Sequence, residues 1–346
     1  MSERAAPRRL RLPIAAHEAV LLTILIAALA VLATLTDRFF TLDNLLNQGM
    51  LMTEVGLIAM PMTFIIVTGG IDLSVGSSLG MCAILLGYSW HNWGFPLPLA
   101  IGFALLCGAA GGFVNGWFIT RLKVPPLIMT IGTLALYRGL AEGISQAHSV
   151  RGYPDWFYGL GQGALFGVPS QLWILGVAII IFGVILARTT IGRSLYAMGY
   201  NETASRFSGL SVDRIKLGIY TASGLMAGLA AWIFVSRVST TRSDMGSGVE
   251  LDVIAAVVLG GTSIFGGTGT IAGSVLGLVL IQLLKDGLAL TGVKGDATIM
   301  VIGTVLILSI LITSFAERRR DVARMARPPL RQTATDQTAT KQGGTP

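Results

Sequence analysis

Apolar runs long enough to cross a lipid bilayer recur along the whole chain. A transmembrane helix needs roughly 20 mostly apolar residues, and shorter runs are tolerated where they pack inside a bundle. The sequence predicts ten such segments, at 15–35, 51–67, 75–89, 97–119, 126–144, 172–187, 217–235, 249–260, 271–290 and 297–315. Because barrel strands alternate polar and apolar residues, these unbroken runs exclude a β-barrel. We therefore expect an all-α integral membrane protein with about ten transmembrane helices.

The composition and the two ends of the chain agree with this class. Charged residues make up 12% of the sequence, about half the share of an average soluble protein. The first segment begins like a secretory signal, but its apolar run exceeds the roughly 7 to 15 residues of a signal core, and no convincing small-residue cleavage site precedes Asp37. We expect it to remain as a span. The predicted membrane domain, 15–315, is flanked by a basic N-terminus, 1–14, and a polar, disordered tail, 316–346.

The basic residues predict the orientation of the chain. With both termini in the cytoplasm, the inner segments hold 18 Lys and Arg residues and the outer segments hold six. Inner loops of membrane proteins carry this excess of positive charge, so we expect both ends inside. Topology and contact with anionic lipid account for the net charge of +7. Nucleic acid is not an expected partner.

The sequence lacks the usual signatures of a catalytic or metal centre. Cys82 and Cys107 fall in predicted spans and are expected to be buried thiols that act as small hydrophobic groups. The three histidines, His17, His91 and His148, show no ligand spacing. No HExxH motif occurs. We therefore expect no metal site, and an intramembrane enzyme is disfavoured.

A glycine-rich stretch, "VTGGIDLSVGSSLG" at 67–80, lies at the junction of the second and third spans. Gly69 and Gly70 weaken a helix, and Asp72 and Ser74 are better suited to a helix start than to a helix interior. The pattern predicts that the chain breaks at the inner face and that Asp72 or Ser74 caps a new helix near Val75.

A second stretch, "VVLGGTSIFGGTG" at 257–269, follows the same pattern between the eighth and ninth spans. It lacks the Lys and Ser/Thr that close a phosphate-binding loop, so a nucleotide site is not expected. Broken helices are tolerated where they line a cavity, which favours a gate or a solute path. Tight packing without gating is the alternative for each glycine. Aligning Gly69 and Gly70 with Gly260 and Gly261 places Gly76 over Gly267. The gate candidates are Gly69, Gly70, Asp72, Gly76, Gly260, Gly261, Gly266 and Gly267.

The longest inner loop, 188–216, contains the pattern of a short helix. Asn201 is a good N-cap, Glu202 suits the positive end of a helix, and Gly209 stands where a glycine often ends one. A helix held outside the bilayer between Arg206 and Arg214 would suit the docking of a cytoplasmic partner. The alternative is an interfacial helix lying on lipid headgroups.

Three motifs in this order resemble a known family. "TGGIDLSVGS", "AMGYNETASRFSGLSVDRIK" and "VLGGTSIFGGTGTIAGSVLG" are similar to the permease subunits of bacterial ABC importers of the ribose type, and the likeness extends from about 40 to 315. The stretch "STTRSDMGSGVELDVIAAVVLGG" most resembles members assigned to rhamnose or autoinducer-2. The resemblance implies a dimer in the bacterial inner membrane, without an ATPase site or cofactor in this chain. The implied partners are cytoplasmic subunits that bind ATP, a periplasmic solute-binding protein, and a second permease copy or paralogue.

The resemblance also assigns roles to residues. It places a helix that couples to the ATPase in the loop 188–216, formed by Asn201, Glu202, Ala204, Ser205 and Gly209. Tyr200 departs from the family, which commonly has a small residue there. The outer loops 145–171 and 236–248 are expected contacts for the binding protein or solvated loops.

A path for a sugar should offer several weak hydrogen bonds, since the binding protein has already selected the solute. The candidates are Glu54, Thr63, Thr68, Ser77 and Asn115. An acid in a span is costly and usually functional, although Glu54 could instead reach water at the outer end. Arg138 and Glu142, four residues apart, are expected to form an ion pair.

Two further transporter classes stay open on the sequence. A branched-chain amino-acid permease would share the importer architecture. An ion-coupled secondary transporter would also have broken helices, but it should show more intramembrane carboxylates than Glu54. A scaffold protein would not need a capped helix in its longest inner loop.

Overall fold

The computed structural model describes residues 41–290 continuously, together with 21–23, 25–26, 292, 297, 300, 303–304 and 307. The predicted spans 15–35 and 297–315 lie almost entirely outside these residues, and the ends 1–14 and 316–346 lie wholly outside them. The chain divides into a unit of Met1–Leu306 and a unit of Ile307–Pro346. The helices and strands below all belong to the first unit.

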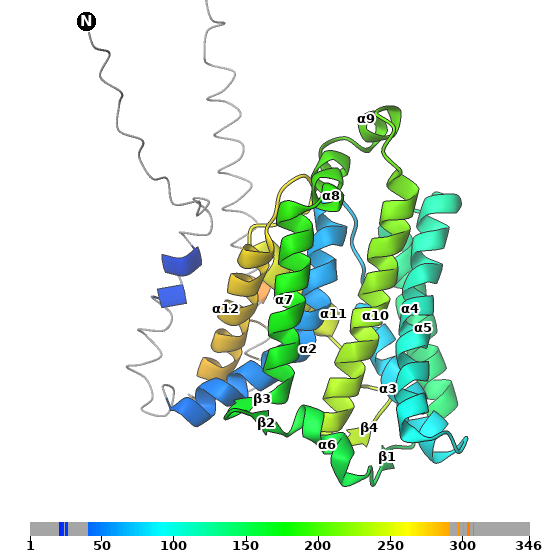
Figure 1. The fold of residues 1–346 in the computed structure, drawn as a ribbon, viewed down its shortest axis with the longest axis vertical. Helices are drawn as coiled ribbons and strands as arrows, with labels where there is room; N and C mark the ends of the chain where they lie inside the picture. The colour runs from blue at the N-terminus through cyan, green and yellow to red at the C-terminus, as the bar shows by residue number, and fades with distance from the viewer. Residues whose placement is uncertain are drawn as a thin grey trace, which may run out of the picture. The chain divides into compact units, whose positions relative to one another are not determined.

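The described chain is mostly helical (Figure 1). Its helices are α2 (Leu42–Val67), α3 (Val75–His91), α4 (Leu97–Arg121), α5 (Pro126–Ser145), α6 (Asp155–Gly161), α7 (Ser170–Arg188), α8 (Thr190–Tyr200), α9 (Glu202–Phe207), α10 (Val212–Val238), α11 (Val249–Leu259) and α12 (Ile271–Leu290). Four strands of two residues each are β1 (Val150–Arg151), β2 (Ala164–Leu165), β3 (Val168–Pro169) and β4 (Thr240–Thr241).

Six described helices are long and apolar enough to cross a membrane: α2, α4, α5, α7, α10 and α12. The predicted spans 75–89 and 249–260 are helical too, as α3 and α11, but they have only 17 and 11 residues. The prediction of a multi-pass helical membrane protein is therefore confirmed at this coarser level. The predicted loop 188–216 also holds a helix that the sequence reasoning missed, α8.

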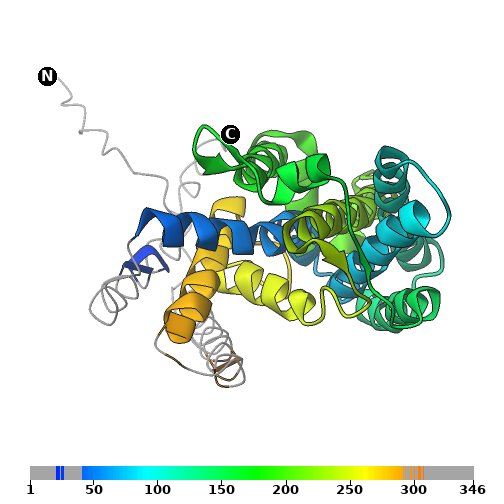
Figure 2. The ribbon, with the colours of Figure 1, turned by 90° about the horizontal axis from the view of Figure 1, so that it is seen from below.

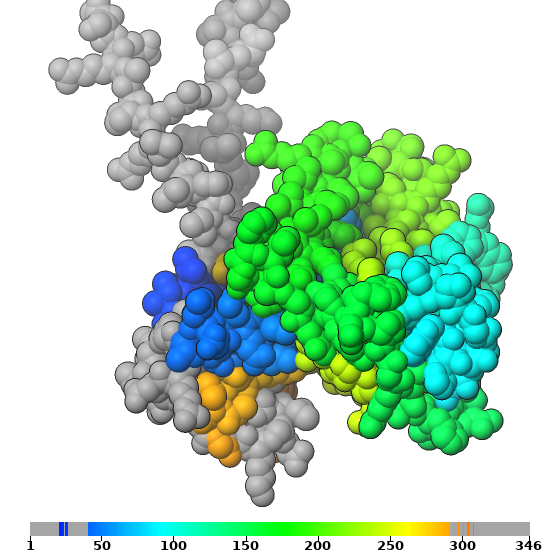
Figure 3. Space-filling model, turned by 60° about the horizontal axis from the view of Figure 1, so that its bottom comes forward, coloured from blue at the N-terminus to red at the C-terminus, as the bar shows by residue number. Residues whose placement is uncertain are grey.

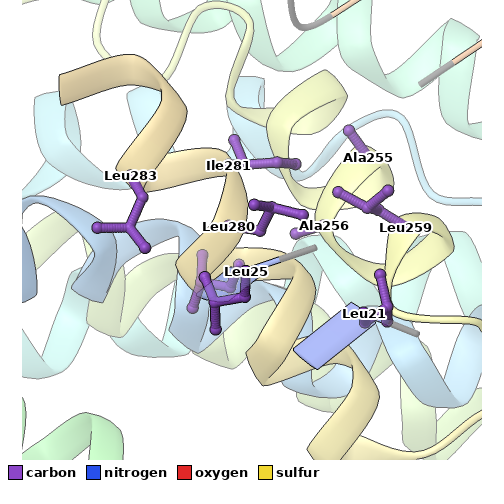
Figure 4. Close-up of a cluster of buried hydrophobic side chains, with 9 residues drawn as sticks. Leu21, Leu25, Ala255, Ala256, Leu259, Leu280, Ile281 and Leu283 are labelled. Atoms are coloured by element: carbon purple, nitrogen blue, oxygen red, sulfur yellow. The ribbon is translucent and has the colours of Figure 1, made fainter. Parts of the chain in front are cut away.

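Helix α2 forms the centre of the bundle. From Gly56 to Val67 every residue is buried, and the helix contacts α7, α10, α11 and α12. Figure 2 shows α2 between α7 on one side and α11 and α12 on the other, with α10 separating it from α4. A buried apolar cluster joins the last two helices to the described part of the N-terminal region (Figure 4). Its members are Leu21, Leu25, Ala255, Ala256, Leu259, Leu278, Leu280, Ile281 and Leu283.

Helices α4 and α10 cross with their backbones in close approach. A β-carbon on Gly112 would collide with the carbonyl oxygen of Tyr220, and one on Gly224 would collide with that of Gly108. Small residues at a crossing allow transmembrane helices to pack closely without a hydrophobic driving force. The glycines of α4 therefore fix the position of α10, which runs from one end of the described bundle to the other.

The end of the bundle below α5 and α7 is closed by connected loops. Strand β1 pairs antiparallel with β4, through Val150 with Thr241 and Arg151 with Thr240, and β2 pairs with β3. The ring of Tyr153 stacks between those of Trp90 and Phe157. Figure 3 shows the green chain between α5 and α7 spread across this end. The two predicted outer loops are thus joined to each other.

Candidate coupling and gate site

Helices α8 and α9 lie at the opposite end of the bundle, and α9 stands at its tip (Figure 1). The Asn201 side chain accepts a hydrogen bond from the Ala204 backbone N–H at 2.9 Å, as the capping pattern predicted. Ser208 ends the helix, and Gly209 follows with a φ of 83°, a conformation that favours glycine. Ser205 is the buried residue of α9. The predicted short helix is therefore present.

Five charged side chains hold α9 in place. Glu202 pairs with Arg206 at 2.8 Å and with Lys216 of α10 at 2.6 Å. Arg206 also pairs with Asp213 at 2.6 Å, and Asp213 pairs with Lys123, in the turn between α4 and α5, at 3.0 Å. Burial opposes ionisation of Glu202, but the hydrogen bonds from Lys216 and Arg206 hold its pKa below the usual range. Half-exposed pairs add little stability singly, but this network fixes α9 against α10 and the α4–α5 turn.

The coupling corner also touches both glycine-rich stretches. A β-carbon on Gly199 of α8 would collide with the carbonyl oxygen of Val67, the last residue of α2, and with the amide of Gly267. The Gly267 N–H donates to the Val67 carbonyl at 2.9 Å. The Tyr196 hydroxyl donates to the carbonyl of Gly269 at 2.7 Å. We call this place the glycine junction: Val67, Gly199 and the turn 260–269.

The glycines of the two stretches are not used in parallel ways. Gly69 and Gly261 both have positive φ, whereas Gly260 has a helical φ of −62° and packs against Gly273 of α12. Within the second stretch, Gly266 and Gly267 also have positive φ, of 87° and 80°.

The alignment of Gly76 with Gly267 is wrong. Gly76 lies in the first turn of α3, where an added β-carbon would collide with the carbonyl oxygen of Gly246 and the carboxylate of Glu250. Gly267 instead lies in a turn at the glycine junction. Spacing alone could not separate a helical glycine that allows close packing from a turn glycine that needs positive φ.

The chain leaves the helix after Val67 and restarts at Val75, as predicted. The expected cap is not formed, because neither the Asp72 nor the Ser74 side chain accepts a hydrogen bond from a backbone N–H in the first turn of α3. Asp72 instead accepts from the N–H and the hydroxyl of Ser74, at 3.0 and 2.6 Å. Its other oxygen accepts from Ser223 of α10 at 3.3 Å. The buried carboxylate thus ties the break to α10.

The region around Asp72 holds further buried polar groups. Asn115 of α4 donates to the Ser74 hydroxyl at 2.9 Å, and Ser77 donates to the Ser74 carbonyl at 2.8 Å. Among the described residues, the side-chain amide oxygen of Asn115 and the hydroxyl of Tyr220 have no hydrogen-bond partner. That hydroxyl lies 2.9 Å from where a β-carbon on Gly70 would stand. The structure therefore brings two of the predicted path residues, Ser77 and Asn115, to the helix break.

Of the other path candidates, Glu54 and Thr63 lie within α2 and Thr68 at the start of the break, and all three bond within the protein. The carboxylate of Glu54 is buried and pairs with Arg237 of α10 at 2.8 Å. Thr63 donates to the Ala59 carbonyl and contacts the hydroxyl of Ser274 of α12, both at 2.8 Å. Thr68 donates to the carbonyl of Ile65 at 2.8 Å.

Arg138 has a different partner from the one expected. Among the described residues it forms no ion pair with Glu142, which is exposed. Its guanidinium instead donates to the carbonyl oxygens of Ser243 and Met245, the latter at 2.9 Å. Arg138 thus holds the loop between β4 and α11 against α5. No local signal in the sequence could have shown this, because the partners are backbone atoms more than 100 residues away.

Comparison with known proteins sets this arrangement in a family. The family model described as "Branched-chain amino acid transport system / permease component" matches residues 41–310. The chain belongs to this permease family. It is also 33% identical, over 323 residues, to the autoinducer 2 import system permease protein LsrD of Escherichia coli K12 and of Shigella flexneri. The match covers 90% of this chain and 98% of each relative. The LsrD protein of E. coli O157:H7 matches equally well. No solved structure matches.

The resemblance drawn from the three motifs is therefore confirmed. The permease is a transport component of a sugar-type ABC importer and a multi-pass protein of the bacterial inner membrane. Importers of this kind work with separate subunits that bind ATP and solute. Membership does not favour an ion-coupled carrier, for which the single acid Glu54 was thin support.

Proposed function

We propose that the permease forms the membrane path for a sugar-like solute related to autoinducer-2, and that α9 receives the movement of a cytoplasmic subunit that hydrolyses ATP. The identity with LsrD proteins supports the solute class, since their name states the import of autoinducer 2. The path opens and closes at the helix break of 68–74. In this proposal the chain itself catalyses no reaction.

The glycine junction is the observation that carries this proposal. The Gly199 backbone of α8 rests on the end of α2, and the turn 260–269 is bonded to that same end at 2.9 Å. Packed segments of this kind move as units. A displacement of α9 and α8 is therefore passed directly to the end of α2, next to the helix break. The ion network carries the same displacement into α10, which holds Asp72 through Ser223.

The proposed topology has ten spans, with α9 and both termini in the cytoplasm. Basic side chains gather at the α9 end: Arg121, Lys123, Arg188, Arg193, Arg206, Arg214 and Lys216. Four of the six tryptophans lie at the other end: Trp90, Trp93, Trp156 and Trp173. Basic residues favour the inner side, and tryptophan favours the membrane interface. The joined strands β1 and β4 would then face a periplasmic solute-binding protein, and a second permease completes the dimer.

The first test is the retention of the ATP-binding subunit. We expect Glu202→Arg to remove most of the ATP-binding subunit that copurifies with the permease in lipid nanodiscs, because the new charge repels Arg206 and Lys216 and displaces α9. Glu142→Arg is the matched control, since it reverses an exposed carboxylate outside this network. If the wild-type permease retains no ATP-binding subunit, or the Glu202 variant retains as much as wild type, the proposed function is wrong.

A further inference from the structure

The turn 260–269 presents a phenylalanine to solvent. The Phe265 side chain is 85% exposed. The turn that carries it is closed by backbone hydrogen bonds from Ser263 to Thr268 at 3.1 Å and from Gly266 to Ser263 at 2.9 Å. The turn is also anchored to α2 through Gly267. A large apolar side chain held out by a well-bonded turn loses little conformational entropy on binding, which is typical of an interface anchor.

Two more exposed aromatic side chains continue this surface toward α9. Tyr200, at the end of α8, is 75% exposed, and its ring lies 3.3 Å from where a β-carbon on Gly267 would stand. Phe207, at the end of α9, is 89% exposed. We call these three residues the aromatic rim. Single exposed apolar residues are ordinary, but a series from three neighbouring segments indicates a binding surface.

The rim is continuous with the surface that the proposed function gives to the ATP-binding subunit. Tyr200 precedes Asn201, the residue that caps α9, and it also packs on the turn that carries Phe265. The Tyr196 hydroxyl bonds the same turn to α8. A protein seated on α9 would therefore face Tyr200 and then Phe265 on one surface.

We propose that Phe265 is a second contact for the ATP-binding subunit, separate from α9 and joined directly to the end of α2. This inference rests on the proposed function and adds a partner contact to it. Through α9, the ATP-binding subunit acts on α8 and α10. Through Phe265, it acts on the turn whose Gly267 is bonded to Val67, one residue before the helix break. The two contacts would then move both sides of the glycine junction together.

The binding test compares two equally exposed phenylalanines. We expect Phe265→Asp to weaken binding of the purified ATP-binding subunit to the permease in nanodiscs by about tenfold or more. Phe166→Asp, at the other end of the molecule and 89% exposed, should bind like wild type. Wild-type affinity in the Phe265 variant, with loss in the Glu202→Arg variant, would overturn the second contact and leave the proposed function standing. Absence of binding to the wild-type permease would overturn both.

A labelling test separates the protein partner from the lipid surface. In a chain with Cys82→Ala and Cys107→Ala, Phe265→Cys is labelled with an environment-sensitive fluorophore. Addition of the ATP-binding subunit should shift the emission of this probe, whereas a probe on Phe166→Cys should not respond. Quenching of the Phe265→Cys probe by nitroxide lipids, without a response to the ATP-binding subunit, would show that the rim lies in the headgroups and would overturn the proposal.

Discussion

Asp72 shows how one side chain can join segments that are far apart in the sequence. Its carboxylate bonds both polar groups of Ser74 and reaches Ser223, 151 residues further along the chain. Ser74 in turn accepts from Asn115 of α4. Leaving buried donors without an acceptor costs about 1–3 kcal/mol for each group. Hydrogen bonds to one acid therefore tie the helix break to α10 and, through Ser74, to α4.

This arrangement predicts which of two substitutions of Asp72 destabilises the protein more. We expect Asp72→Ala to lower the free energy of unfolding by about 2 kcal/mol or more, because it removes every acceptor. Asp72→Asn keeps one oxygen for Ser74 and should lose clearly less. Thermal unfolding of the purified permease in detergent measures the difference, and Asp155→Ala, an exposed position, serves as the control. Equal losses in the Ala and Asn variants would contradict a role based on hydrogen bonds.

Local signals in the sequence predicted local features of the site. The caps around α9 depend on residues within a few positions, so capping rules suffice there. The restart at Val75 was predicted at the correct residue, although the cap expected there is not formed. The partners of Asp72 and Glu54 could not be predicted. Glu54 pairs with Arg237, 183 residues away, and only the packing of α2 against α10 brings them together. The aromatic rim was missed for the same reason.

At the scale of helices, the crossing of α4 and α10 predicts that two glycine-to-alanine substitutions on α4 change the stability of the permease in opposite directions. Gly112→Ala places a methyl group against the carbonyl oxygen of Tyr220, and overpacking of this kind costs about 1–3 kcal/mol. Gly102→Ala, about three turns earlier on α4, meets no atom within 4 Å and should be neutral or stabilise by up to about 1 kcal/mol. Thermal unfolding of both variants tests the crossing. Similar midpoints would show that the backbones do not approach so closely.

The hydrophobic pattern predicted where helices form better than which of them cross the membrane. Apolar runs identified α3 and α11, which have 17 and 11 residues, against the roughly 20 of a typical transmembrane helix. A half-length helix packed inside a bundle is as apolar as part of a full span, so hydropathy cannot separate the two cases. The hydrophobic pattern also missed α8, whose N-cap is Thr189: the Thr189 side chain accepts a hydrogen bond from the Gly192 N–H at 3.3 Å. Only that cap marked it.

At the scale of the whole molecule, the proposed topology predicts accessibility from opposite sides of the membrane. In a chain without its two native cysteines, Phe207→Cys should react with a membrane-impermeant maleimide only in inverted vesicles. Phe166→Cys should react only in right-side-out cells or spheroplasts. Both native residues are 89% exposed, so neither reaction should be limited by burial. The reverse pattern would place α9 in the periplasm and exclude it as a site for ATP-driven coupling.

The position of Gly76 links the two ends of the molecule. From one side, the segment 68–74 leads into the first turn of α3 from the glycine junction. From the other, the segment after β4 reaches the same turn, where Gly246 packs on Gly76 and Arg138 holds Ser243 and Met245. In the proposed function, one short helix start thus receives displacements from solute delivery outside and from ATP consumption inside. In this proposal both events act on the same helix turn, so no long chain of contacts across the membrane is needed to couple them.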